Sequence, residues 1–110
     1  MHFCLTGQYT PQALKSLMAN PSSNRYEAAK KTIEAAGGKM IAMYGMPAEG
    51  PGVLVIFDVT DPGGAAAISG VVIANNVLHN VKLSRLLTME EVAHVRKIAS
   101  KANAAYAPPG

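Results

Sequence analysis

Cysteine is almost missing from this sequence, since Cys4 is the one thiol in 110 residues. A lone cysteine forms no internal disulfide, which is typical of proteins that stay in a reducing compartment. Residues 1–5 also lack the basic region and the long apolar stretch of an export signal. We therefore expect a cytoplasmic protein whose fold depends on its apolar core.

Aromatic side chains and charges are scarce as well. The chain has no tryptophan, four tyrosines and two phenylalanines, and its formal net charge is +3. The basic residues are not interleaved with aromatic ones, and Lys30 and Lys31 follow Glu27 at the spacing of a solvated helix face. Because a nucleic-acid surface combines basic patches with stacking aromatics, we expect no nucleic-acid partner.

Hydrophobic runs suited to a membrane are missing too. The longest charge-free stretch, residues 62–81, contains glycines, asparagines and His79, which hydrocarbon would penalise, so we expect no membrane partner. The sequence also lacks a Gly-x-Ser-x-Gly elbow. It has no glycine-rich phosphate loop, because residues 45–52 connect two strand patterns rather than a strand and a helix. These absences indicate no cofactor.

The patterns that are present predict one domain of mixed α and β structure. Apolar residues make up 49% of the chain, enough for one core. Strict alternation predicts a half-buried first strand over residues 3–9. Further strand patterns cover residues 39–44, 53–59 and 78–87. Cap residues followed by periodic apolar positions predict helices that begin after Thr10, Asn24, Asp61 and Thr88.

This order, β-α-β-β-α-β plus a C-terminal helix, is the split βαβ pattern of the ferredoxin-like α+β fold. Residues 1–88 would form the domain, and residues 89–110 a helix and tail that belong to it or make an oligomer contact. Both helices of the pattern cover one sheet face and leave the other bare. The bare face would mix apolar and polar side chains: His2, Cys4, Thr6, Gln8, Leu54, Ile56, Asp58, Asn80, Lys82 and Ser84. We expect a second copy to pack there, with a wet cavity between the two.

Five segments together resemble the GYD-domain family of small bacterial proteins. They are Tyr9-Thr10-Pro11-Gln12-Ala13, Arg25 with Glu27-Ala28-Ala29, Gly37-Gly38-Lys39 with Tyr44, Asp58-Val59-Thr60-Asp61, and residues 85–91. The resemblance implies a ferredoxin-like fold related to the dimeric α+β barrels, and it implies homo-oligomers. It implies no single activity, and the barrels include cofactor-free monooxygenases and isomerases.

The chain departs from this family at two places. The Gly-Tyr-Asp triplet would fall near Gly50-Pro51-Gly52, where a glycine is kept and the tyrosine and aspartate are absent. Asp58 stands where the family usually has glutamate, which keeps the carboxylate and shortens its reach. No role of the missing Tyr-Asp pair is carried over.

Asp58 is the strongest single candidate for ligand contact, because a carboxylate on an otherwise apolar strand needs a partner. The structural alternative is an ion pair with Lys82 or Arg85, or an exposed strand end. His79 suits proton transfer near neutral pH. It falls on the opposite alternation from Lys82, which predicts a packed or strand-edge histidine unless a β-bulge at Asn80 reverses its side.

Tyr44, Arg85 and Cys4 complete the predicted ligand contacts. No metal is expected, although His2, Cys4 and His79 form a weak alternative as a nitrogen and sulfur site. The sequence thus predicts a homo-oligomer that binds an aromatic or anionic small molecule between protomers, either as a cofactor-free enzyme or without catalysis. The alternative is a structural protein that self-associates through the bare sheet face and the C-terminal helix.

Overall fold

The computed structural model describes residues 1–47 and 50–110. Its elements in chain order are β1 (His2–Tyr9), α1 (Pro11–Ala19), α2 (Arg25–Ala35), β2 (Gly38–Met46), β3 (Gly52–Val59), α3 (Pro62–Ala74), β4 (Leu78–Leu86) and α4 (Met89–Ala105). The expected order is confirmed. No helix within the described residues combines the length and the hydrophobicity needed to cross a membrane.

Side-chain caps begin the helices where the sequence predicted. The Thr10 hydroxyl accepts from the Ala13 amide at 3.1 Å, Asn24 Oδ1 from Glu27 at 3.0 Å, and Asp61 Oδ1 from Gly63 at 2.8 Å. Each cap satisfies an amide that has no partner inside its own helix. Gly37, with φ +81°, ends α2 in the left-handed conformation that glycine adopts without strain.

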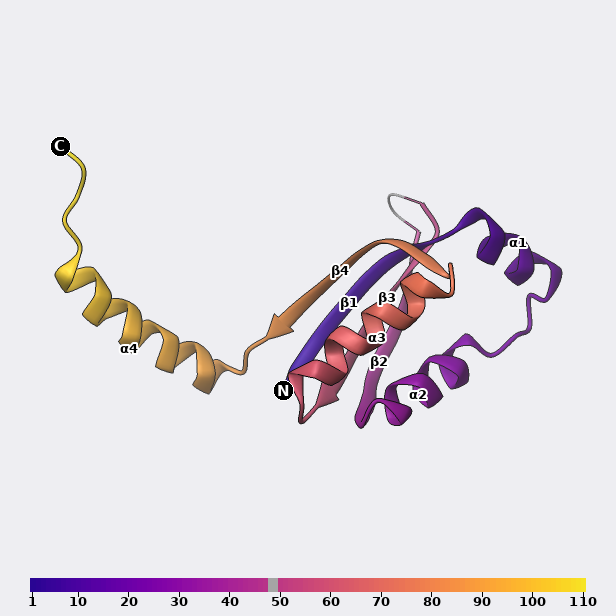
Figure 1. Ribbon diagram of the computed structural model, residues 1–110, viewed down its shortest axis with the longest axis horizontal. Coiled ribbons are helices and arrows are strands. Elements are labelled where there is room, and N and C mark those ends of the chain that lie inside the picture. The colour runs from indigo at the N-terminus through magenta and orange to yellow at the C-terminus, as the bar shows by residue number, and fades with distance from the viewer. Residues whose placement is uncertain (48–49) are drawn as a thin grey trace.

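The four strands form one antiparallel sheet in the order β2-β3-β1-β4. Helix α2 packs on β2 and α3 packs mainly on β4, so both cover the same sheet face above the two edge strands (Figure 1). This is the ferredoxin-like α+β fold. The two central strands, β3 and β1, lie beneath the space between these helices.

The core lies on the helix-covered face of the sheet. Phe3 and Leu5 of β1 and Val55 and Phe57 of β3 are buried there, and the rings of Phe3 and Phe57 stack with centroids 6.0 Å apart. The alternate residues of β1, His2, Cys4, Thr6 and Gln8, face the other side and are half-buried or exposed. The predicted alternation of β1 is therefore confirmed.

A β-bulge in β4 changes the side of the sheet on which His79 lies. Thr6 pairs with Lys82, whereas Gln8 pairs with His79, so β4 has one extra residue in this interval. Asn80 is the extra residue, with a φ of +51°, and its side-chain amide donates to Gln8 Oε1 at 2.7 Å. His79 therefore lies exposed on the open face with Lys82, at the sheet edge, and the alternation that placed it on the other face is corrected.

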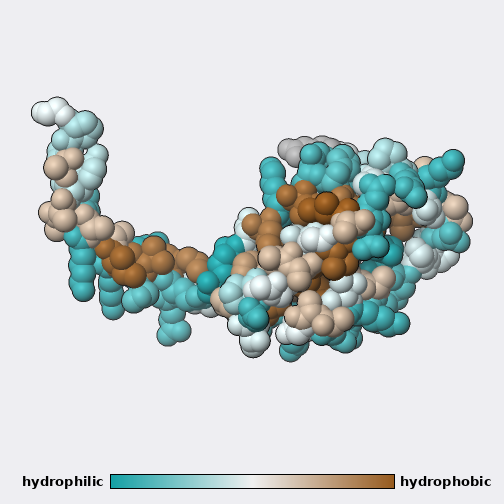
Figure 2. All heavy atoms as spheres, in the orientation of Figure 1, coloured by the Kyte–Doolittle hydropathy of each residue, from teal (hydrophilic) through white to brown (hydrophobic). Residues whose placement is uncertain are grey.

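Helix α3 contains no charged residue, yet it is covered on one side only. Ala65 and Ile68 face the sheet and are buried, whereas Val71 and Ile73 remain about half exposed. Figure 2 shows apolar side chains gathered around this helix. The one chain thus leaves apolar surface on α3.

Helix α4 projects away from the sheet and buries none of its residues (Figure 1). The radius of gyration is 17.7 Å, against about 13 Å for a compact chain of this length. An apolar stripe nevertheless follows α4, as the brown band in Figure 2 shows. Helical spacing assigns to it Val92, Val95, Ile98, Ala99 and Ala102, and Tyr106 follows at the C-cap.

Candidate functional site

The five predicted ligand contacts are spread over all four strands and do not meet in one place. Asp58 lies opposite His2 at one end of β1, and His79 lies opposite Gln8 near the other end. Six residues of an extended strand span about 20 Å, too far for one small ligand to touch both. Tyr44 is on β2 at the far edge from His79, and its side chain is exposed.

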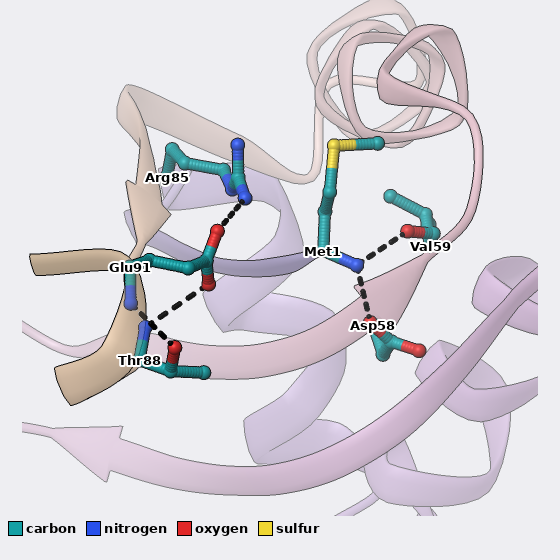
Figure 3. Close-up of polar contacts among 6 residues, drawn as sticks. All are labelled: Met1, Asp58, Val59, Arg85, Thr88 and Glu91. Carbon is teal, nitrogen blue, oxygen red and sulfur yellow. Dashed lines mark hydrogen bonds and ion pairs between the residues drawn. The ribbon is translucent and has the colours of Figure 1, made fainter. Parts of the chain in front are cut away.

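Asp58 has a structural partner that the sequence reasoning missed. Its carboxylate lies 2.8 Å from the ammonium of Met1, which also donates to the Val59 carbonyl at 3.0 Å (Figure 3). The hydrogen bond from this ammonium holds the pKa of Asp58 below its ordinary value. The structural alternative of an ion pair with Lys82 or Arg85 is wrong, because Lys82 lies opposite Thr6, four residues along β1 from His2, and Arg85 pairs with Glu91.

Arg85 lies in the row opposite Phe3 and does not reach the open face. Its guanidinium is 2.6 Å from the Glu91 carboxylate (Figure 3). Glu91 also accepts from the Thr88 amide at 3.1 Å, and the Thr88 hydroxyl accepts from the Glu91 amide at 3.1 Å. The hydrogen bond from the Thr88 backbone, followed by the charge of Arg85, lowers the pKa of Glu91. Arg85 therefore holds the start of α4.

Cys4 lies mid-strand on the open face, opposite Ile56 and Ser84, and burial raises the pKa of its thiol. The weak metal alternative fails on distance, because His2 and His79 are separated by most of β1. Among residues 1–47 and 50–110, no three His, Cys, Asp or Glu side chains converge as metal ligands would. Whether Cys4, Tyr44, Asp58 or His79 contacts a ligand stays a prediction.

A groove of about 320 Å³ lies on the other face of the sheet, between α2 and α3. It exists because α2 packs on the edge strand β2 and α3 packs mainly on the edge strand β4, which separates the two helices above the central strands. Its floor is formed by Leu5, Val55 and Phe57 and its walls by small or apolar residues of both helices, among them Ala28 and Val72. Polar groups are few and gather at one end.

Tyr9 and Arg25 provide two of those polar groups, and the prediction of site residues missed both. Tyr9 continues the alternation of Phe3, Leu5 and Gly7, so the pattern of β1 already placed it on the core-facing side. Arg25 is the first residue of α2, where the positive end of the helix dipole disfavours a cation. The unfavourable position of Arg25 at the start of a predicted helix was the feature of the sequence that could have indicated a site residue.

The model of one protein family, the GYD domain, matches residues 3–95. The chain belongs to the GYD domain family. The match includes all four strands, α1 to α3 and the first two turns of α4. It confirms the resemblance drawn from the five sequence segments. No curated protein sequence matches this chain.

Solved structures support the fold of this GYD-family chain. The 5-chloro-2-hydroxyhydroquinone dehydrochlorinase TftG of Burkholderia phenoliruptrix AC1100, solved with 2,5-dihydroxybenzoquinone, has a TM-score of 0.57 at 12% identity and covers 83% of this chain and 98% of its own. A protein of Agrobacterium tumefaciens is similar with a TM-score of 0.46 at 8% identity over 81% of this chain and 96% of its own. At these identities the similarity to TftG establishes the ferredoxin-like fold alone.

Proposed function

We propose that this chain binds an aromatic or otherwise apolar small molecule in the groove between α2 and α3 and acts as a homo-oligomer. The observation that carries the proposal is the groove itself, which lies between two helices above the core-facing side of β1 and β3. Its volume of about 320 Å³ suits a small ligand, since binding sites are mostly apolar hollows of about 300–1,000 Å³.

The groove also differs from the site that the sequence predicted. The predicted cavity lay between protomers, on the open face, whereas this groove lies within one protomer on the helix-covered face. Among the described residues, no histidine or carboxylate lines it. General acid–base chemistry uses histidine most often, and the lining is mostly apolar, which supports binding. Cofactor-free catalysis stays a prediction.

Ligand binding can be tested with N-phenyl-1-naphthylamine, a neutral aromatic probe that fluoresces in apolar surroundings. We expect saturable binding to the intact chain and at least about tenfold weaker binding to Ala28→Met, whose longer side chain fills the groove. The matched control is Ala35→Met, because Ala35 lies on the same helix, is exposed and does not line the groove. Equal probe affinity for wild type and a folded Ala28→Met variant would contradict the proposal.

Self-association is the second candidate function, and two unpartnered surfaces favour it. The open sheet face presents Leu54 and Ile56, half-buried, beside the exposed ring of Tyr44. Helix α4 presents its apolar stripe to solvent. We propose that a second copy of this chain covers both surfaces, so that residues 89–110 make an oligomer contact.

A further inference from the structure

A second, polar hollow of about 600 Å³ lies beside one end of the apolar groove. The two cavities share four lining residues, Tyr9, Arg25, Asn75 and Val77, so they are adjacent to each other. The groove contributes apolar walls, and the hollow contributes hydroxyl and amide groups such as those of Ser22 and Ser23. A ligand that occupies both must be apolar at one end and polar at the other.

Arg25 is the only charged residue in the lining of either cavity, as far as residues 1–47 and 50–110 show. It is half-buried, and the ion pairs within that part of the chain are those of Asp58, Glu34 and Glu91 with other cations. Arg25 therefore stands at the junction of the cavities with no carboxylate partner. A guanidinium is well suited to bind a carboxylate or sulfonate in a bidentate way.

Helix stability does not explain why an arginine occupies this position. Arg25 is the first residue of α2, where the unpaired amides of the first turn already carry partial positive charge. A cation there is unfavourable for the helix. The same partial charge adds to that of the guanidinium, so both would attract an anion held in the hollow.

The walls of the hollow are held in place by hydrogen bonds that do not involve Arg25. The Thr10 hydroxyl donates to the Asn76 carbonyl at 2.7 Å, and Asn76 Nδ2 donates to Gln12 Oε1 at 2.9 Å. These bonds join the start of α1 to the segment that follows α3. The hollow is thus formed before any ligand arrives, and Arg25 can be replaced without removing a wall contact.

We infer that the site takes an amphipathic anion, with its apolar or aromatic body in the groove and its carboxylate or sulfonate on Arg25. The inference rests on the proposed groove binding and specifies its ligand class. It also assigns Arg25 as the group that distinguishes an acid from the neutral compound of the same shape.

Two probes that differ by one sulfonate test the inference: N-phenyl-1-naphthylamine and 1-anilinonaphthalene-8-sulfonate. We expect Arg25→Gln to lower the affinity for the sulfonate probe by about tenfold or more. The affinity for the neutral probe should change by less than about twofold. Arg25→Lys, which keeps the charge and loses the fork geometry, should give an intermediate value. The sodium salt of 1-naphthoic acid should displace the sulfonate probe, and acetate at the same concentration should not.

Lys31→Gln is the matched control, because Lys31 lies on α2, is exposed and lines neither cavity. It removes the same unit of charge and should leave both affinities unchanged. The role of Arg25 would be overturned if Arg25→Gln weakened the binding of both probes equally. It would also be overturned if Lys31→Gln weakened binding of the sulfonate probe as much as Arg25→Gln does. Either result would leave groove binding standing. Failure of the neutral probe to bind wild type would instead refute groove binding itself.

Discussion

At the residue scale, Arg25 and Arg85 show how much the surroundings decide what one side chain does. Arg85 lies 2.6 Å from Glu91 and holds the junction between β4 and α4. Arg25 is half-buried beside two cavities and has no ion-pair partner among the described residues. Arg85 therefore serves the structure, whereas Arg25 is available to a ligand.

The capping box of α4 should be lost in acid. The folded-state pKa of Glu91 is lowered from 4.5, so its carboxylate stabilises the start of α4 above pH 4.5. This contribution disappears as the pH falls through the lowered pKa. We expect the Cα chemical shifts of residues 89–93 to move toward random-coil values over that pH range.

Glu90→Gln is the control for this titration, because Glu90 is adjacent to Glu91 and belongs to the same first turn. It should leave the transition in place, whereas Glu91→Gln should abolish its pH dependence. A transition unchanged in Glu91→Gln would assign the effect to another group.

At the element scale, the hairpin of β2 and β3 depends on close backbone contact at one of its glycines. A Cβ on Gly52 would overlap the carbonyl oxygen of Gly7 on the neighbouring strand β1. A Cβ on Gly45, on the other strand of the hairpin, would meet no atom within 4 Å. The two glycines therefore have different structural roles, although both flank the same predicted turn in the sequence.

Gly52→Ala should lower the free energy of unfolding by about 1–3 kcal/mol, because β1 and β3 must move apart to admit the methyl group. Gly45→Ala should leave it unchanged or raise it by less than about 1 kcal/mol, since alanine restricts the unfolded chain. Urea unfolding followed by circular dichroism measures both changes. Equal stability of the two variants would show that β1 and β3 tolerate the wider spacing.

At the scale of the whole molecule, one chain leaves the apolar stripe of α4 exposed. A single helix of 17 residues is marginal in water, yet α4 projects from the domain with its apolar stripe exposed (Figure 1, Figure 2). The Arg85–Glu91 pair and the capping box set the direction in which α4 leaves β4. A helix directed away from its own sheet can bury this stripe only against another molecule.

We therefore expect the chain to be a homo-oligomer at micromolar concentration by size-exclusion chromatography with light scattering. Ile56→Glu should lower the measured mass, because it places a charge in the middle of the open face. Ile73→Glu is the matched control, since Ile73 is exposed on α3, away from that face. A monomeric wild-type chain would refute self-association, and equal masses for wild type and Ile56→Glu would exclude the open face as the interface.

Local patterns in the sequence were enough to predict most of the fold. The alternation of Phe3 and Leu5 against Cys4 placed β1 correctly, because the side-chain period of a strand is set by covalent geometry. The caps at Thr10, Asn24 and Thr88 placed three helix starts, because a cap acts within three residues. His79 was assigned to the wrong face, since one extra residue at Asn80 inverts every position beyond it.

The sequence by itself determined the elements, their order, the ferredoxin-like sheet and its bare face, because each depends on spacings along the chain. Only the tertiary structure decided the site. The groove arises from the separation of α2 and α3 above β1 and β3, and Arg25 and Tyr9 meet there from distant parts of the sequence. Asp58 and His79, both candidates for ligand contact from the sequence, are held about 20 Å apart by the length of β1. Which polar residues converge depends on the distances between strands and helices. No local pattern in the sequence contains those distances.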